Sequence, residues 1–174
     1  RTRSDECGNP CPAWSRTAVA ALLTENNYQI NSIEMNVQIN PEMDQTQVNI
    51  LVVDDIPLNV LLIQKMLGKF KFNILTANNG QAALDIIASK PVDLVLLDLM
   101  MPGIDGYEVL RQLRGNDATK NLPVVILSAL NSSDDVTKGF QLGANDFITK
   151  PIIMERLLTC VATQANQIWD NKNS

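Results

Sequence analysis

The chain has 174 residues, of which 45% are hydrophobic and 19% are charged, and its formal net charge is −5. This length suits one ordinary domain with an additional segment, and the composition is that of a globular protein rather than a disordered one. The negative charge offers no basic surface to nucleic acid, so we expect no direct DNA binding. The apolar runs are strand-sized and fall short of the roughly 20 residues that a membrane span needs, so we expect no membrane segment.

The first 46 residues lack the apolar and helical alternation of the rest of the chain, and we interpret them as a tail or linker, derived in part from cloning. One helix is predicted within them, over Pro12–Thr24. The cysteines Cys7, Cys11 and Cys160, in a chain without histidine, indicate neither a disulfide framework nor a zinc site. We find no signal peptide, and we expect a cytoplasmic protein.

From Val48 onward, short apolar runs alternate with helical patterns, which is typical of βα units around a parallel sheet that is buried on both faces. We expect this folded domain to span residues 47–170, with a C-terminal tail at 171–174. The predicted strands are Val48–Val53, Phe72–Ala77, Val92–Leu97, Val124–Ser128 and Asp146–Ile148. The predicted helices are Pro57–Phe70, Gly80–Ser89, Gly106–Leu113, Asp134–Leu142 and Met154–Trp169. Cys160 falls on the apolar stripe of the last helix, where we expect a core residue.

Polar side chains end four of the five predicted strands. Asp54 and Asp55 follow the first strand, Asp98 follows the third, Ser128 ends the fourth, and Lys150 comes just after the fifth. Ligand sites of open parallel sheets form at the carboxyl ends of the strands, so we expect these side chains to converge. A single aspartate in such a place is more readily explained as a helix cap or a turn residue. The joint pattern favours a functional site.

Three carboxylates on one edge of a sheet repel one another unless a positive charge lies between them. Oxygen ligands without histidine or cysteine select Mg²⁺ or Mn²⁺ over zinc, and Lys150 adds a fixed positive charge. A carboxylate can attack phosphorus to form an acyl phosphate, and the cation and the lysine would then neutralise the transferring group. The residues therefore predict metal-dependent phosphoryl chemistry.

The sequence resembles the receiver domains of two-component response regulators across about Gln47–Trp169. The stretches that carry the resemblance, in order and in spacing, are Ile50–Asp55, Asp98–Glu108, Pro123–Ala129, Gly143–Phe147 and Lys150–Pro151. The resemblance implies an α/β fold, a flavodoxin-like doubly wound five-stranded parallel sheet, (βα)5, with strand order 2-1-3-4-5. It also implies a phosphoacceptor of a phosphorelay, which is a signalling domain with intrinsic autophosphorylation and autodephosphorylation rather than an enzyme.

The resemblance gives roles to the residues at the strand ends. Asp98 would accept the phosphoryl group, Asp55 would ligate Mg²⁺ directly and Asp54 would hold it mainly through water. Asp98 itself and the main-chain carbonyl of Met100 would complete the protein ligands. The family also implies that Met100 and Leu130 tune the lifetime of the acyl phosphate. Because both are apolar, neither side chain can position an attacking water, and we expect slow self-dephosphorylation.

Switching roles follow from the same resemblance. Ser128 would hydrogen-bond the phosphoryl oxygens and Lys150 would pair with them. When Ser128 moves toward the phosphorylated site, Phe147 would turn into the vacated space and change the surface of the fourth helix, fifth strand and fifth helix. The alternative interpretation of Phe147 is a core aromatic residue without a switching role. The family further implies a cis peptide bond between Lys150 and Pro151.

A histidine kinase or histidine phosphotransfer protein must supply the phosphoryl group, because the chain has no histidine of its own. The downstream protein partner is unidentified, and a phosphorylation-dependent homodimer is a further option. We expect either a stand-alone receiver or one excised from a larger regulator or hybrid kinase. Two alternatives stay open, a metal-dependent aspartyl phosphohydrolase and an interaction module that works without phosphorylation. A dinucleotide-binding enzyme is disfavoured, since no Gly-x-Gly-x-x-Gly motif follows the first strand.

Overall fold

The computed structural model describes residues 37–130 and 132–174. Five parallel strands form one sheet in the order β2-β1-β3-β4-β5. The helix predicted over Pro12–Thr24 and the cysteines Cys7 and Cys11 lie outside the described residues. The strands are β1 (Asn49–Val53), β2 (Asn73–Ala77), β3 (Leu94–Asp98), β4 (Val124–Ser128) and β5 (Asp146–Thr149).

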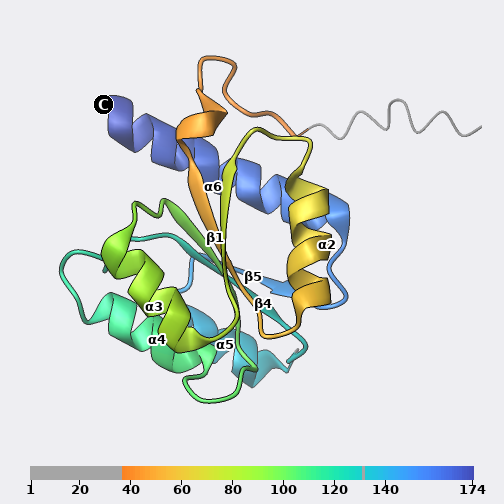
Figure 1. Cartoon of the computed structure of the whole chain (residues 1–174), viewed down its shortest axis with the longest axis vertical. Helices are drawn as coiled ribbons and strands as arrows, with labels where there is room; N and C mark the ends of the chain where they lie inside the picture. Colours follow the sequence, from red (N-terminus) through yellow and green to blue (C-terminus); the bar gives the residue numbers. More distant parts are fainter. Residues whose placement is uncertain (1–36, 131) are drawn as a thin grey trace, which may run out of the picture. The chain divides into compact units, whose positions relative to one another are not determined.

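Helices cover both faces of the sheet, with α2 and α6 on one face and α3, α4 and α5 on the other (Figure 1). The predicted flavodoxin-like, doubly wound fold with strand order 2-1-3-4-5 is therefore confirmed. Within the described part of the chain, none of the helices could span a lipid bilayer. The helices are α2 (Pro57–Leu67), α3 (Gly80–Ser89), α4 (Gly106–Arg114), α5 (Ser133–Gln141) and α6 (Met154–Asn173), and a 3-10 turn, η1 (Gln45–Gln47), precedes β1.

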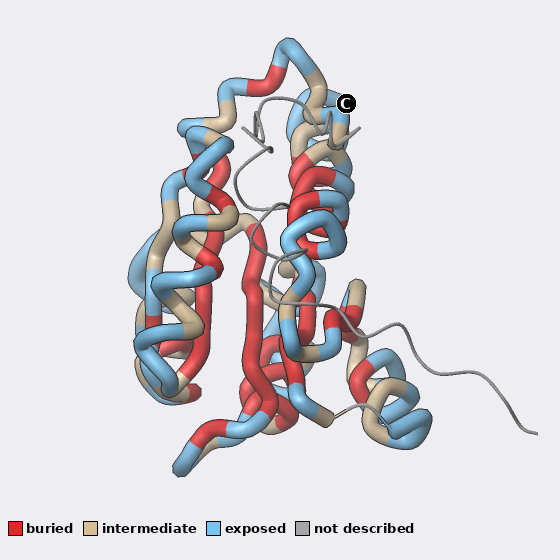
Figure 2. Tube along the Cα trace, turned by 90° about the vertical axis from the view of Figure 1, so that its right-hand side faces the viewer, coloured by how far each residue is buried: buried red, intermediate tan, exposed pale blue. Residues whose placement is uncertain are grey.

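The central strands are apolar on both sides because no face of them meets water. Every residue of β3 and β4 is buried, and the buried positions in Figure 2 follow the strands and the inner sides of the helices. Burial of this kind supplies most of the driving force for folding. It also explains why the strands appear in the sequence as continuous apolar runs rather than as alternating ones.

The strand register brings the predicted site residues to one edge of the sheet. Val53 pairs with Leu97, so the residues that follow, Asp54 and Asp98, lie level with each other. In turn Asp98 pairs with Leu127, which places Ser128 one step beyond it. Ser128 pairs with Thr149, the residue before Lys150. Parallel pairing alone therefore collects the polar strand ends.

The last helix is longer than the sequence pattern predicts, because α6 continues to Asn173 rather than ending near Trp169. Near its end, Lys172 Nζ lies 2.6 Å from a carboxylate oxygen of Asp93. Asp93 also accepts hydrogen bonds from the backbone and side-chain nitrogens of Asn49, at the start of β1. This long-range anchor, which local periodicity does not reveal, fixes the final turns of the helix.

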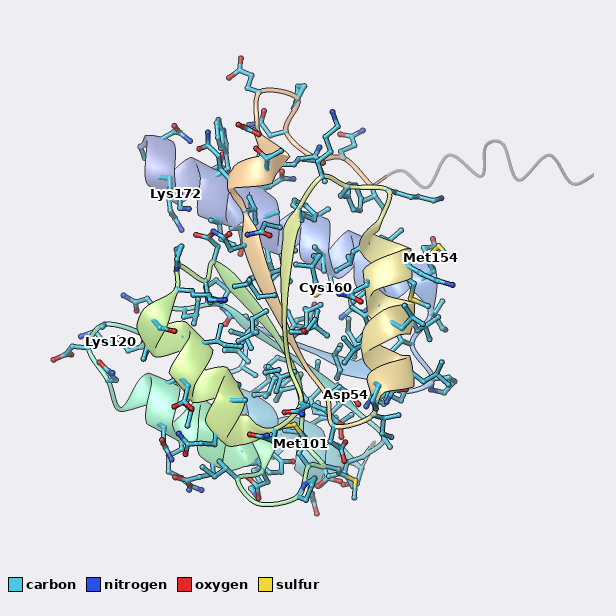
Figure 3. All side chains as sticks on the ribbon, in the orientation of Figure 1. Asp54, Met101, Lys120, Met154, Cys160 and Lys172 are labelled. Carbon is cyan, nitrogen blue, oxygen red and sulfur yellow. The ribbon has the colours of Figure 1, made fainter. Side chains whose placement is uncertain are left out.

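Residues 37–48 contact this same helix, although we predicted most of them as part of a tail. Asn166 of α6 accepts a hydrogen bond from Asn40 N at 2.9 Å and donates one to the carbonyl of Gln38 at 2.9 Å. Met43 and Val48 are buried. We call these contacts, together with the pair formed by Lys172, the α6 clasp; Figure 3 shows Lys172 at the end of the sheet opposite Asp54.

We predict that Asn166→Ala lowers the free energy of unfolding by about 1–2 kcal/mol, because two hydrogen bonds of ordinary strength are lost. Urea denaturation followed by circular dichroism measures the change. Asn171→Ala is the matched control, since Asn171 is an exposed residue of α6 whose side chain makes no hydrogen bond to the described residues. Equal losses for the two variants would show that the clasp adds no stability.

Candidate metal and phosphoryl site

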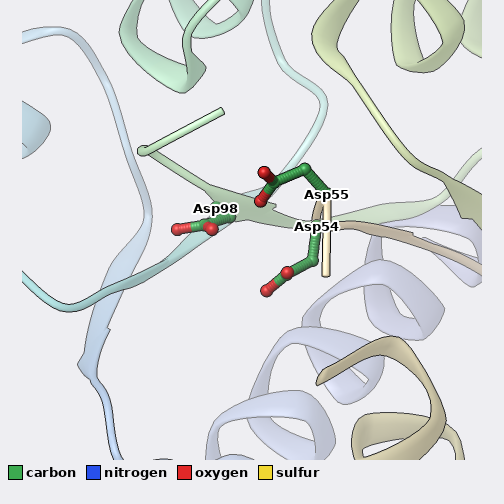
Figure 4. A group of neighbouring side chains, drawn as sticks. All are labelled: Asp54, Asp55 and Asp98. Atoms are coloured by element: carbon green, nitrogen blue, oxygen red, sulfur yellow. The ribbon is translucent and has the colours of Figure 1, made fainter. Parts of the chain in front are cut away.

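Three carboxylates meet at the carboxyl ends of β1 and β3. Asp54, Asp55 and Asp98 each offer an oxygen within 4.8 Å of the others, and Figure 4 shows the three groups projecting to the same side of the strand ends. Asp54 is 1% exposed and Asp98 4% exposed, whereas Asp55 is half-buried. Among the described residues this is the one acidic or cysteine cluster tight enough to hold a metal ion.

Lys150 lies against this cluster and supplies its positive charge. Its Nζ is 2.7 Å from Asp54 Oδ2 and 3.0 Å from Asp98 Oδ2. Burial opposes the charge on the lysine, but the hydrogen bonds to Asp54 and Asp98 leave its pKa above the ordinary value. The ammonium group therefore stays protonated and offsets part of the repulsion among the carboxylates.

The negative charge of Asp98 is balanced by fewer hydrogen-bond donors than that of Asp54. Burial raises the pKa of Asp98, and Asp54 adds to the rise, while the bonds from Lys150 and the longer one from Met100 N at 3.4 Å oppose it. Asp54 instead accepts hydrogen bonds from Ile56 N, from Lys150 and from Asn59 Nδ2. Sequence reasoning missed Asn59; the amide in the first turn after the acidic pair was the one available signal.

The donor set fits a hard divalent cation. It consists of carboxylate oxygens at the mouth of a sheet, and the chain contains no histidine that could favour zinc. Asp54, Asp55 and Asp98, with the main-chain carbonyl of Met100 as the resemblance implies, are the residues that would hold such an ion. The role of that carbonyl stays a prediction.

The loop between β3 and α4 depends on a glycine. A Cβ added at Gly106 would lie 2.3 Å from the carbonyl oxygen of Asp98 and 2.8 Å from Leu99 Cα. Without one, Gly106 N donates to the carbonyl of Leu99 at 3.1 Å and the loop folds back over the end of β3. This close approach leaves the Met100 side chain 58% exposed beside the site.

Ser128 and Phe147 lie on neighbouring strands behind the carboxylates. Ser128 is fully buried, and its hydroxyl accepts a hydrogen bond from Leu130 N at 3.1 Å. The ring of Phe147 is buried and faces Gly139 of α5, where an added Cβ would lie 3.4 Å from the ring. Lys150 and Pro151 are joined by a cis peptide bond, as the resemblance implied. Cys160, free and buried with its pKa raised by burial to about 12, is confirmed as a core residue.

Comparison with known proteins identifies this arrangement. The sequence model of the response regulator receiver domain matches residues 50–162. The match extends over more than half of the chain and includes all of the strand-end residues described above. The chain therefore belongs to the response regulator receiver family, whose members are the receiver domains of two-component signalling.

Curated relatives and a solved structure agree with this assignment. A probable cyclic di-GMP phosphodiesterase of Vibrio cholerae serotype O1 is 40% identical over 120 residues, which are 69% of this chain and 27% of that protein. The protein PilH of Pseudomonas aeruginosa is 35% identical over 112 residues, 64% of this chain and 93% of PilH. The receiver domain of the Francisella response regulator 1452 superposes with a TM-score of 0.65 at 31% identity and covers 69% of this chain and 98% of that domain. The chain thus spans about a quarter of the first relative's length.

The raised pKa of Asp98 predicts a pH-dependent stability of the metal-free protein. The folded chain holds a proton on Asp98 more readily than the unfolded chain does, so this group lowers stability as the pH rises from the ordinary aspartate pKa through the raised one. In EDTA near neutral pH, Asp98→Asn should therefore melt a few degrees above the wild type, and the difference should shrink as the pH falls through this window. Differential scanning calorimetry measures it, with the exposed Asp85→Asn as the control. If the difference in melting temperature between Asp98→Asn and the wild type did not change with pH, the ionisation of Asp98 would not be its cause.

Proposed function

We propose that this chain is a phosphoacceptor that takes a phosphoryl group on Asp98 from a histidine kinase or a histidine phosphotransfer protein, with Mg²⁺ or Mn²⁺ bound. The observation that carries the proposal is the position of Asp98, which is buried 3.0 Å from Lys150 and within 4.8 Å of two further carboxylates. Asp54 and Asp98 share the single ammonium group of Lys150. A buried carboxylate in such an environment is found at reactive sites more often than in helix caps. The domain itself acts as a signalling module and not as an enzyme.

The transfer requires little covalent chemistry from the protein. A carboxylate oxygen of Asp98 attacks phosphorus, the bond from phosphorus to the donor nitrogen breaks, and the donor imidazole leaves with the electron pair. Lys150 neutralises charge on the phosphoryl oxygens while Asp54 and Asp55 face the same space. A bound Mg²⁺ would supply the remaining positive charge and orient the phosphoryl oxygens. Ser128 lies one register step from Asp98, and its hydroxyl would donate a hydrogen bond to a phosphoryl oxygen of the product.

The contacts of α5 support a switching role for this helix. Lys138 Nζ lies 3.9 Å from the centre of the Tyr107 ring, and Tyr107 Oη donates to the carbonyl of Asp135 at 3.3 Å. These contacts tie α5 to α4 while Phe147 packs beneath it. If Ser128 moves toward a phosphorylated Asp98, α5 must shift against them, which changes the surface of α5, β5 and α6. A downstream partner or a second copy of the chain would bind there.

The labelling experiment tests the proposal directly. With acetyl phosphate and Mg²⁺, the intact mass of the wild type should increase by one phosphoryl group, and that of Asp98→Asn should not change. Without Mg²⁺, or with EDTA present, the mass of the wild type should not increase. A wild type that binds Mg²⁺ but never labels would favour an interaction module without phosphorylation. Continuous release of phosphate from an unrelated monoester would favour a phosphohydrolase.

Exposed apolar side chains surround the entrance to the site and suit a protein donor. Three of the chain segments that leave site residues carry one: Ile56 after the acidic pair, Met100 after Asp98 and Ile153 after Lys150. The first turns of α2 add an exposed stripe formed by Leu58, Leu61 and Leu62. We call this stripe with Ile56 the α2 face. Apolar residues exposed beside a reactive group mark a surface that a partner covers, and a phosphohistidine must be carried to Asp98 by such a partner.

Replacing Leu58 with Ser should therefore slow transfer from a phosphorylated histidine phosphotransfer protein by about tenfold or more, since central apolar contacts carry much of the binding energy. Labelling by acetyl phosphate should be unchanged, because this small donor needs no docking surface. Phe140→Ser, at an exposed apolar position on α5 away from the α2 face, is the control. Equal loss with both donors would place Leu58 in the chemistry and contradict the docking role.

The lifetime of the acyl phosphate can be tested at the two apolar positions beside Asp98. Met100 is exposed and Leu130 is half-buried, and neither side chain can orient a water molecule. Leu130→Glu supplies a carboxylate that can, so we expect hydrolysis to accelerate about tenfold or more. Loss of the phosphoryl mass with time measures the decay, with Ser133→Glu as a control for added charge. A wild-type lifetime as short as that of Leu130→Glu would contradict the expectation of slow self-dephosphorylation.

A further inference from the structure

Asn59 makes a contact with the acidic cluster that the roles given above do not use. It lies in the first turn of α2, and its Nδ2 is 3.0 Å from Oδ1 and 3.0 Å from Oδ2 of Asp54. The amide nitrogen of Asn59 thus contacts both oxygens of the Asp54 carboxylate, and Asp54 is 1% exposed. Asp54 follows β1 and Asn59 is the third residue of α2, so the contact joins the end of the strand to the first turn of the helix.

Asp54 is saturated by these and its other donors. Ile56 N donates to Oδ1 at 2.9 Å, Lys150 Nζ donates to Oδ2 at 2.7 Å, and the Asn59 amide reaches both oxygens. A carboxylate has about four lone-pair positions, so each oxygen here has its full complement of donors. Asp55, by contrast, makes no side-chain hydrogen bond within the described part of the chain and is the freer ligand.

The two side-chain donors to Asp54 differ in charge, and this difference decides which can remain when a cation is held by the cluster. Lys150 carries a full positive charge close to the space between the carboxylates, so a second cation there repels it. Asn59 is neutral and donates from the helix side, so its contact can persist. With Lys150 drawn toward the phosphoryl oxygens, Asn59 becomes the one side chain among the described residues that still donates to Asp54.

We infer that Asn59 is a positioning residue for metal binding, which keeps the Asp54 carboxylate oriented toward the ion or toward a water bound to it. The inference rests on the proposed function, since it concerns the cation that the phosphoacceptor reaction uses. Partners that orient a metal ligand typically change metal affinity by about 10-fold to 100-fold when they are removed. The reaction at full occupancy depends on Asp98 and Lys150 and is left intact.

Binding of Mn²⁺ to the full chain, measured by electron paramagnetic resonance of the free ion, tests this without any phosphodonor. Asn59→Ala and the more space-filling Asn59→Leu should both weaken Mn²⁺ binding about tenfold. Gln64→Ala, on the same helix and with a side chain that makes no hydrogen bond to the described residues, should bind Mn²⁺ as the wild type does. Circular dichroism verifies that each variant is folded at the temperature of the titration.

A second readout separates positioning from general damage to the site. With acetyl phosphate, the Mg²⁺ concentration for half-maximal labelling should rise about tenfold in Asn59→Ala, whereas the rate at saturating Mg²⁺ should stay within about twofold of the wild type. Unchanged Mn²⁺ affinity in both variants, with a wild type that binds, would overturn the inference alone. A wild type that binds no Mn²⁺ at the cluster would overturn the proposed function as well.

Discussion

The repulsion among three carboxylates at one edge of a buried sheet is the constraint on which the site depends. Parallel pairing leaves no choice about their proximity, because the register that buries Val53 against Leu97 also sets Asp54 level with Asp98. Lys150, held by both carboxylates, offsets the repulsion in part, but burial, with a smaller contribution from Asp54, keeps the pKa of Asp98 raised. The folded chain thus keeps an unfavourable charge arrangement that a divalent cation can relieve.

The carboxylates of Asp54 and Asp98 differ in how fully their charges are paired. Residues that serve stability alone are seldom left partly uncompensated at the end of a strand, since a buried charge without full pairing costs free energy. Asp54 has its complement of donors whereas Asp98 relies on Lys150 and one long bond from Met100. In the proposed function, this contrast distinguishes the supporting carboxylate of Asp54 from the reacting carboxylate of Asp98. It is a difference in hydrogen bonding rather than in residue type.

Much of the fold was predictable because parallel sheets buried on both faces produce continuous apolar runs with polar residues at their ends. Helix α3 has the predicted bounds, and Pro57 begins α2 where its fixed backbone angle suits a first turn. The extension of α6 to Asn173 was not predictable, because the ion pair between Lys172 and Asp93 joins residues that are far apart in the sequence. The contact of Asn59 with Asp54 was missed for a related reason, since an asparagine in a first helical turn has many possible partners.

The α6 clasp has a mechanical consequence. Gln38 and Asn40, which precede the family-matched residues 50–162, bond to Asn166 of α6. The last turn of α6 is paired with Asp93 through Lys172, at the end of the sheet remote from Asp54 (Figure 3). A rod fixed at one end swings about that end, so a tilt of α6 displaces Ile153 and Met154 most and Asn173 least. Any motion that begins at Lys150 is in this way amplified near the site's entrance and damped where the helix stops.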